Sequence, residues 1–355
     1  MNQSLVRKLH VRQHFHSVGN GFFYGLDITD HDSKEEGLLF IYDCGAKSKK
    51  IFLQRELSTF NKRHDSTRAI DILVISSFDE VYFKGLFELL ENRKKGENVF
   101  LPYLNMDERK RYSSSTHSGN SDYLYFLNDP DLFLKKYFKK VYYVKKAEHA
   151  LPYTPNHVGL GEEHIELVTN AGKEDNIIDD NSYLKTNLGW LFYFHTSASG
   201  DRGTEKNLSC IHGPLSLKHC FPTGFWYSKR KIYLYNYCLR STRWLSFGGK
   251  DFCVLTGAMN LKTGWDDLKI KLQKMHKRIS IFIIPNCQKY ECWNSQVASD
   301  LDPDAWIISS QFLSFFKFNN DVISDLKDLS RGAEICKIHE FRDLALERIL
   351  ILKVS

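Results

Sequence analysis

Apolar and polar residues alternate along the first part of the chain, which is the period of a half-buried strand. The alternation covers residues 6–28 and is interrupted by glycines near its middle, so it predicts two strands joined by a tight turn. Residues 37–45 predict a further strand. Residues 69–78 are almost continuously apolar, which predicts a strand covered on both faces, as in a layered α/β protein.

Helical spacing of apolar positions appears between these strands. It covers residues 48–64, 84–96 and 122–138, and the last of these is interrupted at Pro130. After residue 150 the pattern becomes rich in strands, with one more helix near the C-terminal end. Strands and helices mix throughout without a clear linker, so we expect a single domain, 1–355, with helices on two packed sheets.

One stretch departs from both patterns. Residues 113–121, with the sequence SSSTHSGNS, contain turn-forming residues and almost no apolar ones. They predict a mobile loop.

The composition is that of an ordinary globular protein, with 42% hydrophobic and 26% charged residues. The N-terminus lacks the apolar segment of a secretory signal, and no apolar run is long enough to span a bilayer. We therefore expect a cytoplasmic protein with reduced cysteines and no membrane partner. The net charge of +6 is modest for this length, so basic clusters predict solvated faces, with phosphate contacts as the alternative.

A series of landmarks then suggests a family. In chain order they are HFHSVGNGFFYGLDI, LLFIYDCG, ILVISSFDEVYFKGL, CVLTGAMN, IFIIPNCQ and AWIISS. This order and spacing resemble metallo-β-lactamase-fold hydrolases, especially the branch related to DNA-uptake nucleases and to bacterial defence. The resemblance implies an α/β fold, a metallo-β-lactamase-like αββα sandwich in which two packed mixed β-sheets are flanked by helices.

The metal-binding positions of that family are largely replaced. The family motif at the end of the strand predicted over 69–78 is H-x-(H/D)-x-D-H, and here its ligand positions fall on Ser77, Asp79, Val81 and Tyr82. The bridging carboxylate falls on Ala258, and the later histidine on Asn286 or Cys287. Two-metal hydrolysis needs several imidazoles and carboxylates that converge on the ions. We therefore expect no metal and no catalytic residues, but a vestigial pocket made of Asp43, Ser77, Asp79, Glu80, Tyr82, Ala258 and Asn286.

Other ligand-type residues have two interpretations each. Asp79 and Glu80 predict an acidic start of a helix, with a single divalent cation near Asp79 as the alternative. His14 and His16 alternate on one strand face and predict polar strand residues, with ligands of a relocated metal site as the alternative. A further set of ligand-type residues consists of Cys210, His212, His219 and Cys220. Their spacing matches no zinc module, so we do not expect them to bind zinc.

The functional expectation follows from the replaced ligands. The chain is expected to be a catalytically inactive regulatory or scaffolding subunit that binds a protein, a defence effector encoded nearby, in a bacterial anti-phage system. The alternatives are a divergent metal-dependent nuclease or phosphodiesterase, and a nucleic-acid-binding module. The expected binding residues are the lysines and tyrosines of one basic, aromatic run: Lys139, Lys140, Tyr142, Tyr143, Lys145 and Lys146.

Overall fold

The computed structural model describes most of the chain in segments. The described residues are 5–32, 37–47, 49–115, 121–147, 156–159, 165–169, 176–199, 205–214, 217–220, 225–231, 238–244, 252–257, 259–275, 278–285, 292–309, 320–330, 333–339 and 343–354.

The first of two β-sheets has 11 strands and contains both ends of the described chain. Its strands run parallel from β3 to β9 and antiparallel elsewhere, so the sheet is mixed. In spatial order it consists of β15 (Cys238–Trp244), β14 (Phe225–Lys231), β20 (Leu344–Val354), β1 (Leu5–Phe15), β2 (Gly21–Asp30), β3 (Leu38–Ala46), β4 (Ile72–Val74), β5 (Gly96–Pro102), β6 (Phe138–Lys145) and β9 (Ile177–Asp179), with β13 (Leu217–Cys220) also paired to β20.

The second sheet has 9 strands and is also mixed, because its strands from β16 to β19 are parallel and the others antiparallel. In spatial order it consists of β19 (Glu334–Ile338), β18 (Ala305–Ser309), β17 (Ile279–Ile284), β16 (Phe252–Leu255), β12 (Glu205–Pro214), β11 (Trp190–Ser199), β10 (Tyr183–Thr186), β8 (Ile165–Thr169) and β7 (Asn156–Gly159).

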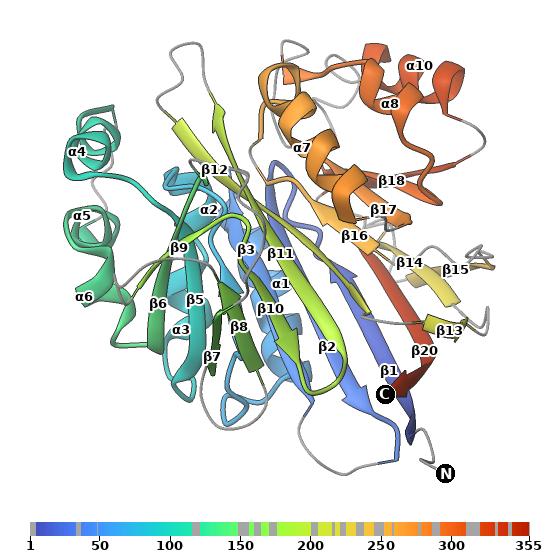
Figure 1. Cartoon of the computed structure of the whole chain (residues 1–355), viewed down its shortest axis with the longest axis horizontal. Coiled ribbons are helices and arrows are strands. Elements are labelled where there is room, and N and C mark those ends of the chain that lie inside the picture. Colours follow the sequence, from blue (N-terminus) through green and yellow to red (C-terminus); the bar gives the residue numbers. More distant parts are fainter. Residues whose placement is uncertain are drawn as a thin grey trace.

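Helices cover the outer faces of the two sheets (Figure 1). The first sheet carries α1 (Lys50–Arg63), α2 (Glu80–Phe83), α3 (Leu86–Leu90), α4 (Met106–Ser115), α5 (Ser121–Asn128) and α6 (Pro130–Leu134). The second carries α7 (Leu261–Met275), α8 (Gln296–Asp300) and α10 (Asn320–Leu329). The predicted α/β architecture of two packed mixed sheets is thus confirmed. In the described part of the chain, no helix is both long and apolar enough to cross a membrane.

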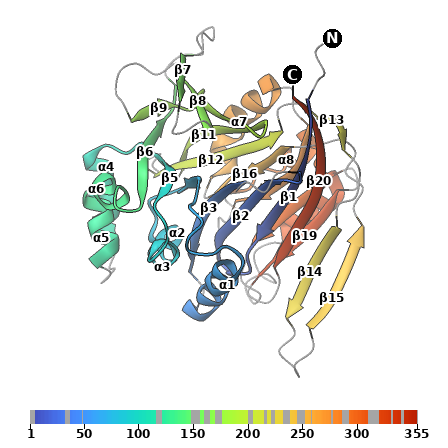
Figure 2. The ribbon, with the colours of Figure 1, turned by 90° about the horizontal axis from the view of Figure 1, so that it is seen from below.

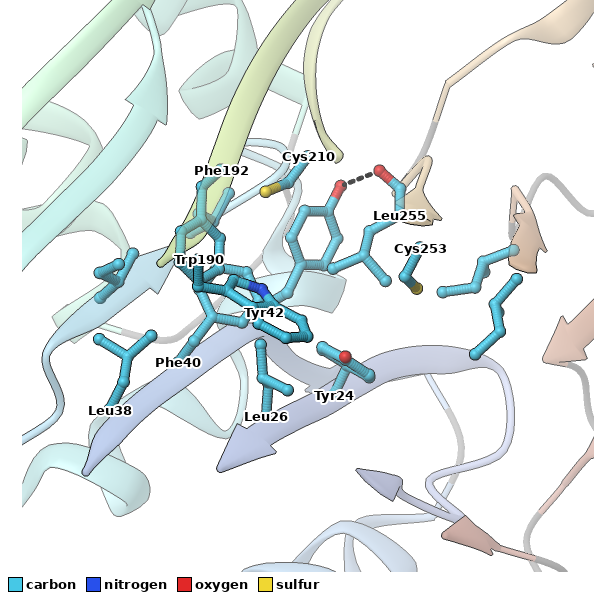
Figure 3. Close-up of a cluster of buried hydrophobic side chains, with 14 of the residues drawn as sticks. Tyr24, Leu26, Leu38, Phe40, Tyr42, Trp190, Phe192, Cys210, Cys253 and Leu255 are labelled. Atoms are coloured by element: carbon cyan, nitrogen blue, oxygen red, sulfur yellow. Dashed lines mark hydrogen bonds between the residues drawn. The ribbon is translucent and has the colours of Figure 1, made fainter. Parts of the chain in front are cut away.

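The main core lies between the sheets and follows the alternation seen in the sequence. Val11 of β1 points inward, as does Tyr24 of the neighbouring strand β2. Tyr42 lies at the centre, and its one hydroxyl hydrogen is shared between the backbone carbonyls of Leu208, at 2.7 Å, and Leu255, at 3.3 Å. Figure 3 draws the contact with Leu255. These bonds satisfy the phenol hydroxyl and connect the first sheet to the second.

Two glycines let β2, β3 and α2 approach one another closely. A Cβ on Gly21 would lie 2.2 Å from the carbonyl oxygen of Gly45, and a Cβ on Gly45 would lie 1.8 Å from that of Val81. Any side chain at either position would displace the backbone. The glycines among the landmarks therefore have a packing role that needs no catalysis.

Three predicted elements differ from the structure. The strand expected over 69–78 is only β4, because the chain turns towards α2 after Val74. The helix expected over 84–96 ends after α3, where Asn92 has a φ of 61°. Residues 113–115 of the expected loop continue α4; the rest of it, 116–120, lies outside the described residues and α5 begins at residue 121.

Candidate functional site

The β4–α2 corner is the place where the family resemblance puts a metal site; we use this name for Asp43 and residues 75–82. Asp43 lies in the second half of β3 with a φ of 54°, and its Oδ1 accepts a hydrogen bond from the backbone N–H of Ser76 at 2.7 Å. Burial raises the pKa of Asp43 from 3.8 to about 7, and its Oδ2 has no hydrogen-bond partner among the described residues. Asp43 therefore fixes the path of the chain after β4.

The other polar residues of the corner serve the local backbone. The Oγ of Ser77 accepts a hydrogen bond from the N–H of Asp79 at 3.2 Å, and the Oδ1 of Asp79 accepts one from the N–H of Val81 at 2.9 Å. Asp79 is exposed and caps α2, while Asp43 is buried. Glu80 occupies the first turn of α2. This cap matches the predicted acidic helix start.

Apolar packing occupies the remaining ligand positions of the motif. Tyr82 is only 4% exposed and belongs to the core between the sheets, with Val81 packed against that core. The end of β16 also meets the corner, since a Cβ on Gly257 would lie 2.6 Å from both the Cβ of Ser76 and the hydroxyl of Tyr42. Ala258, Asn286 and Cys287 lie outside the described residues.

Ligand-type side chains converge elsewhere, beneath α1. Within the described part of the chain, a group of three with ligand atoms less than 4.8 Å apart occurs once, and it consists of His14, His16 and Glu56. β1 and the turn after it supply the histidines, and α1 supplies the glutamate. We call these three residues, together with Ser17, Arg55, Arg63 and Asp343, the buried histidine cluster.

Hydrogen bonds fix the protonation of both histidines. Arg63 lies 2.9 Å from the Nδ1 of His14, and because a guanidinium only donates, this nitrogen accepts. The ring proton of His14 then sits on Nε2 and faces Asp343 at 3.1 Å. The Nδ1–H of His16 donates to Glu56 at 3.2 Å, which leaves a lone pair on its Nε2. That nitrogen has no partner among the described residues.

His16 is an uncharged core residue. Its ring lies between those of His14 and Phe23, with both centroids 3.9 Å away, and it is stacked on Phe23. Burial lowers the pKa of His16 to about 3, and this outweighs the opposite effect of Glu56. The imidazole therefore stays neutral near pH 7.

Both carboxylates of the cluster already accept hydrogen bonds, and Glu56 also pairs with a cation. Glu56 accepts hydrogen bonds at its Oε1 from Ser17 at 2.7 Å and from Arg55 at 3.2 Å. Asp343 reaches Arg63 through His14. A metal ion on the Nδ1 of His14 would have to replace Arg63 and would remain close to Arg55. Like charges about 4 Å apart repel by about 4 kcal/mol at a protein-like dielectric constant, so the two arginines oppose a cation bound at this nitrogen.

The basic, aromatic run proposed for binding forms β6, which is an inner strand. Tyr142 is 6% exposed and stacks on Phe100, with centroids 5.1 Å apart, so it is not available as a surface anchor. Tyr143 is half-buried against the core beneath the helices, and burial raises its pKa. Lys139 pairs with Glu97 at 2.8 Å, and Lys146 pairs with Asp267. Lys140 and Lys145 complete the run, and a binding role for its lysines stays a prediction.

His212, from the set considered for zinc, is a hydrogen-bonded core residue. Trp190 donates to its Nδ1 at 3.3 Å, so its proton sits on Nε2, which lies 3.0 Å from the hydroxyl of Tyr24. Cys210 is buried nearby with a raised pKa. This is the structural role expected from the sequence.

A second buried polar group was not foreseen from the sequence. Asp180 accepts two hydrogen bonds from Thr196, each 3.1 Å long, and lies 3.8 Å from His195. Lys271 of α7 reaches the backbone carbonyl of Asp180, and burial lowers the pKa of Lys271. These contacts connect α7 and β11 to the end of β9, and so hold the two sheets together at this edge.

No known family model matches the chain, and a search of curated proteins finds no match.

Proposed function

We propose that this chain is a metallo-β-lactamase-fold protein without hydrolytic activity, which acts as a regulatory or scaffolding subunit by binding another protein. The observation that supports this proposal is the chemistry of the β4–α2 corner. Its acidic residue Asp79 caps a helix, its aromatic residue Tyr82 fills the core, and Asp43 is used by the backbone of Ser76. A hydrolytic site would need imidazoles and carboxylates aimed at a shared ion.

The bacterial anti-phage context belongs to the same proposal and rests on the order of the sequence landmarks. In that context the partner is a defence effector encoded nearby. A subunit of this kind keeps its scaffold because the partner binds the scaffold, while the metal ligands are free to change. The packing roles of Gly21 and Gly45 fit such a history, since they support the sheets whether or not chemistry occurs.

The second candidate is a metal-dependent phosphodiesterase with a relocated site, and the buried histidine cluster is the observation that favours it. His14, His16 and Glu56 are suitable ligand types for zinc or manganese. Arg55 and Arg63 oppose it, because they already donate to Glu56 and to His14. We therefore place this candidate second.

An activity assay separates the two candidates. The purified protein is incubated with bis-p-nitrophenyl phosphate and with single- and double-stranded DNA, in the presence of added zinc or manganese. The first proposal predicts no turnover above that of a Glu56→Gln, His16→Gln variant. Metal-dependent turnover that this variant loses would establish the relocated site and overturn the proposal.

A further inference from the structure

The outer side of α1 is exposed along the length of the helix. α1 lies on the outer face of the first sheet, with α3 beside it (Figure 2). Its buried residues Leu53, Leu57 and Phe60 pack towards the sheet. The exposed residues recur every three or four positions, which places them on one stripe opposite the buried ones. This outer stripe consists of Lys50, Ile51, Gln54, Ser58, Asn61 and Lys62.

Most of the net charge of the chain is concentrated at this helix. Residues 47–68 contain seven lysines and arginines against two acidic residues, which gives a formal net charge of +5, out of +6 for all 355 residues. One of the two acidic residues, Glu56, is fully buried in the histidine cluster. The exposed lysines of the stretch are Lys47, Lys49, Lys50 and Lys62. Within the described part of the chain, none of these four forms an ion pair, so their charge faces solvent.

An apolar side chain lies among these cations. Ile51 has the highest exposed fraction, 66%, among the large apolar side chains that the structure describes. Lys50 precedes it, and Arg55 lies one turn further along the helix. A single exposed isoleucine is normal on a protein surface. An apolar centre with a charged rim, however, is the arrangement of a protein–protein interface.

The charge of α3 limits the kind of partner that fits. Glu88 and Glu91, at the end of α3, are exposed, and together with Lys62 they line a surface hollow of about 600 Å³. Arg93 also lines the hollow, but its guanidinium already donates to Asn61 and to backbone carbonyls. A nucleic acid or an anionic membrane would therefore meet carboxylates beside the lysines of α1. A protein surface can place basic residues next to acidic ones and so match both helices.

We infer that the outer stripe of α1 and the neighbouring end of α3 bind a partner protein. Acidic residues of the partner contact the lysines of α1, an apolar residue contacts Ile51, and basic residues contact Glu88 and Glu91. This inference rests on the proposed function, because it names the surface by which a non-hydrolytic subunit holds its partner. It places the interface away from β6, where Tyr142 is buried and two of the lysines are already paired.

The test uses a fluorescein-labelled, alanine-based helical peptide that carries a stripe of glutamates, a stripe of lysines and a leucine between them. Its binding to the full chain is followed by fluorescence anisotropy. The Lys50→Glu, Lys62→Glu variant should bind it about tenfold more weakly, because two attractive charge pairs become repulsive. The matched control is Lys185→Glu, Lys274→Glu, which makes the same change of net charge at exposed positions on β10 and α7. It should bind within about twofold of the original chain.

A second variant separates the pattern of charge from its total. Glu88→Lys, Glu91→Lys makes the chain more positive, yet it should bind the peptide about fivefold more weakly, because the lysine stripe of the peptide then meets lysines. Unchanged or stronger binding would mean that this surface attracts any polyanion, and would overturn the inference.

A third variant tests the apolar centre. Ile51→Ser should bind the peptide about fivefold more weakly, because the leucine of the peptide loses its apolar contact. The control is Ile270→Ser on α7, where the isoleucine is 50% exposed, and it should bind within about twofold of the original chain. Equal loss of affinity in the two variants, or no loss in either, would contradict an interface centred on α1.

The remaining outcomes concern folding and the choice of ligand. Thermal unfolding checks that each variant is folded, and Lys50→Gln, Lys62→Gln removes the charges without reversing them, so it too should weaken peptide binding. A DNA duplex or phosphatidylglycerol vesicles that bind more tightly than the peptide, and that Lys50→Glu, Lys62→Glu releases, would replace the inference with a polyanion surface. Absence of peptide binding would overturn the inference while leaving the proposed function intact, because that function fails only on metal-dependent turnover.

Discussion

The β4–α2 corner and the buried histidine cluster lie on the same sheet and use similar residue types for different purposes. In the corner, Asp79 caps a helix and Tyr82 packs in the core. In the cluster, two histidines and two carboxylates converge, but Arg55 already donates to Glu56 and Arg63 to His14. The comparison teaches that ligand-type residues suit a metal ion only when no other cation already donates to their acceptor atoms.

The largest expected effect comes from breaking the cluster. Glu56→Ala would leave the guanidinium of Arg55 and the Nδ1–H of His16 without their shared acceptor. We expect a loss of about 3–5 kcal/mol in the free energy of unfolding, which urea denaturation measures. Glu56→Gln should cost clearly less because it retains an acceptor oxygen, and the exposed Glu91→Ala should change little. A Glu56→Ala protein as stable as the original would contradict a stabilising role for these hydrogen bonds.

The cluster could be foreseen from the sequence only in part. Glu56 lies on the apolar stripe of α1 with Leu53, Leu57 and Phe60, and a carboxylate on such a stripe is a signal that it has a buried partner. The alternation of His14 and His16 predicts their shared face. Asp343 is 329 residues from His14, and no local pattern predicts a contact over that distance.

More of the β4–α2 corner than of the cluster could be predicted from the sequence. The start of α2 at Asp79–Glu80 and the helix on residues 48–64 follow from local signals, and the structure confirms both. The short length of β4 does not, because an apolar run has the same appearance in a strand and in a buried loop. β6 is an inner strand because it pairs with β5 on one side and β9 on the other, and the sequence does not show these pairings. In the sequence, its tyrosines therefore look like part of a surface motif.

A smaller effect is expected from placing ligands back in the corner. Tyr82→His with Val81→Asp should not restore hydrolysis, since two ligands do not rebuild a pre-organised site. The pair should also cost about 1–3 kcal/mol of stability, because it places polar groups in the core. Thermal unfolding and the phosphodiester assay check both parts. Unchanged stability would mean that the corner is open and wet rather than packed.

The contributions of His16 and Asp43 to folding stability should change in opposite directions with pH. His16 binds a proton in the unfolded chain below pH 6.5 but in the folded chain only below about 3, so its contribution to stability is complete above pH 6.5 and is lost as the pH falls through that window. Asp43 holds its proton up to about pH 7 when folded but only to 3.8 when unfolded, so its contribution decreases as the pH rises. Each slope is about 1.4 kcal/mol per pH unit.

Single variants separate these contributions between pH 4 and 6.5. Asp43→Asn removes the contribution to stability that decreases as the pH rises, so the stability of this variant should increase more steeply with pH than that of the original chain. His16→Gln should do the reverse. Denaturation at several pH values measures both slopes, and two variants with the same slope would contradict the burial of one of the groups.

The smallest effect is expected at the cap of α2. Asp79→Ala should cost about 1 kcal/mol by removing the acceptor for the N–H of Val81, and Asp79→Asn should cost a few tenths. Thermal unfolding measures this difference. If Asp79 instead held a cation, both variants would lose a bound ion, and a chelator would destabilise the original chain alone.

Elemental analysis of the purified full chain tests the central claim most directly. The account predicts no stoichiometric zinc, manganese or iron, because the described residues of the corner do not converge as ligands and arginines already donate to Glu56 and His14 in the cluster. A content of about two transition-metal ions per chain, as a two-metal hydrolase requires, would contradict it.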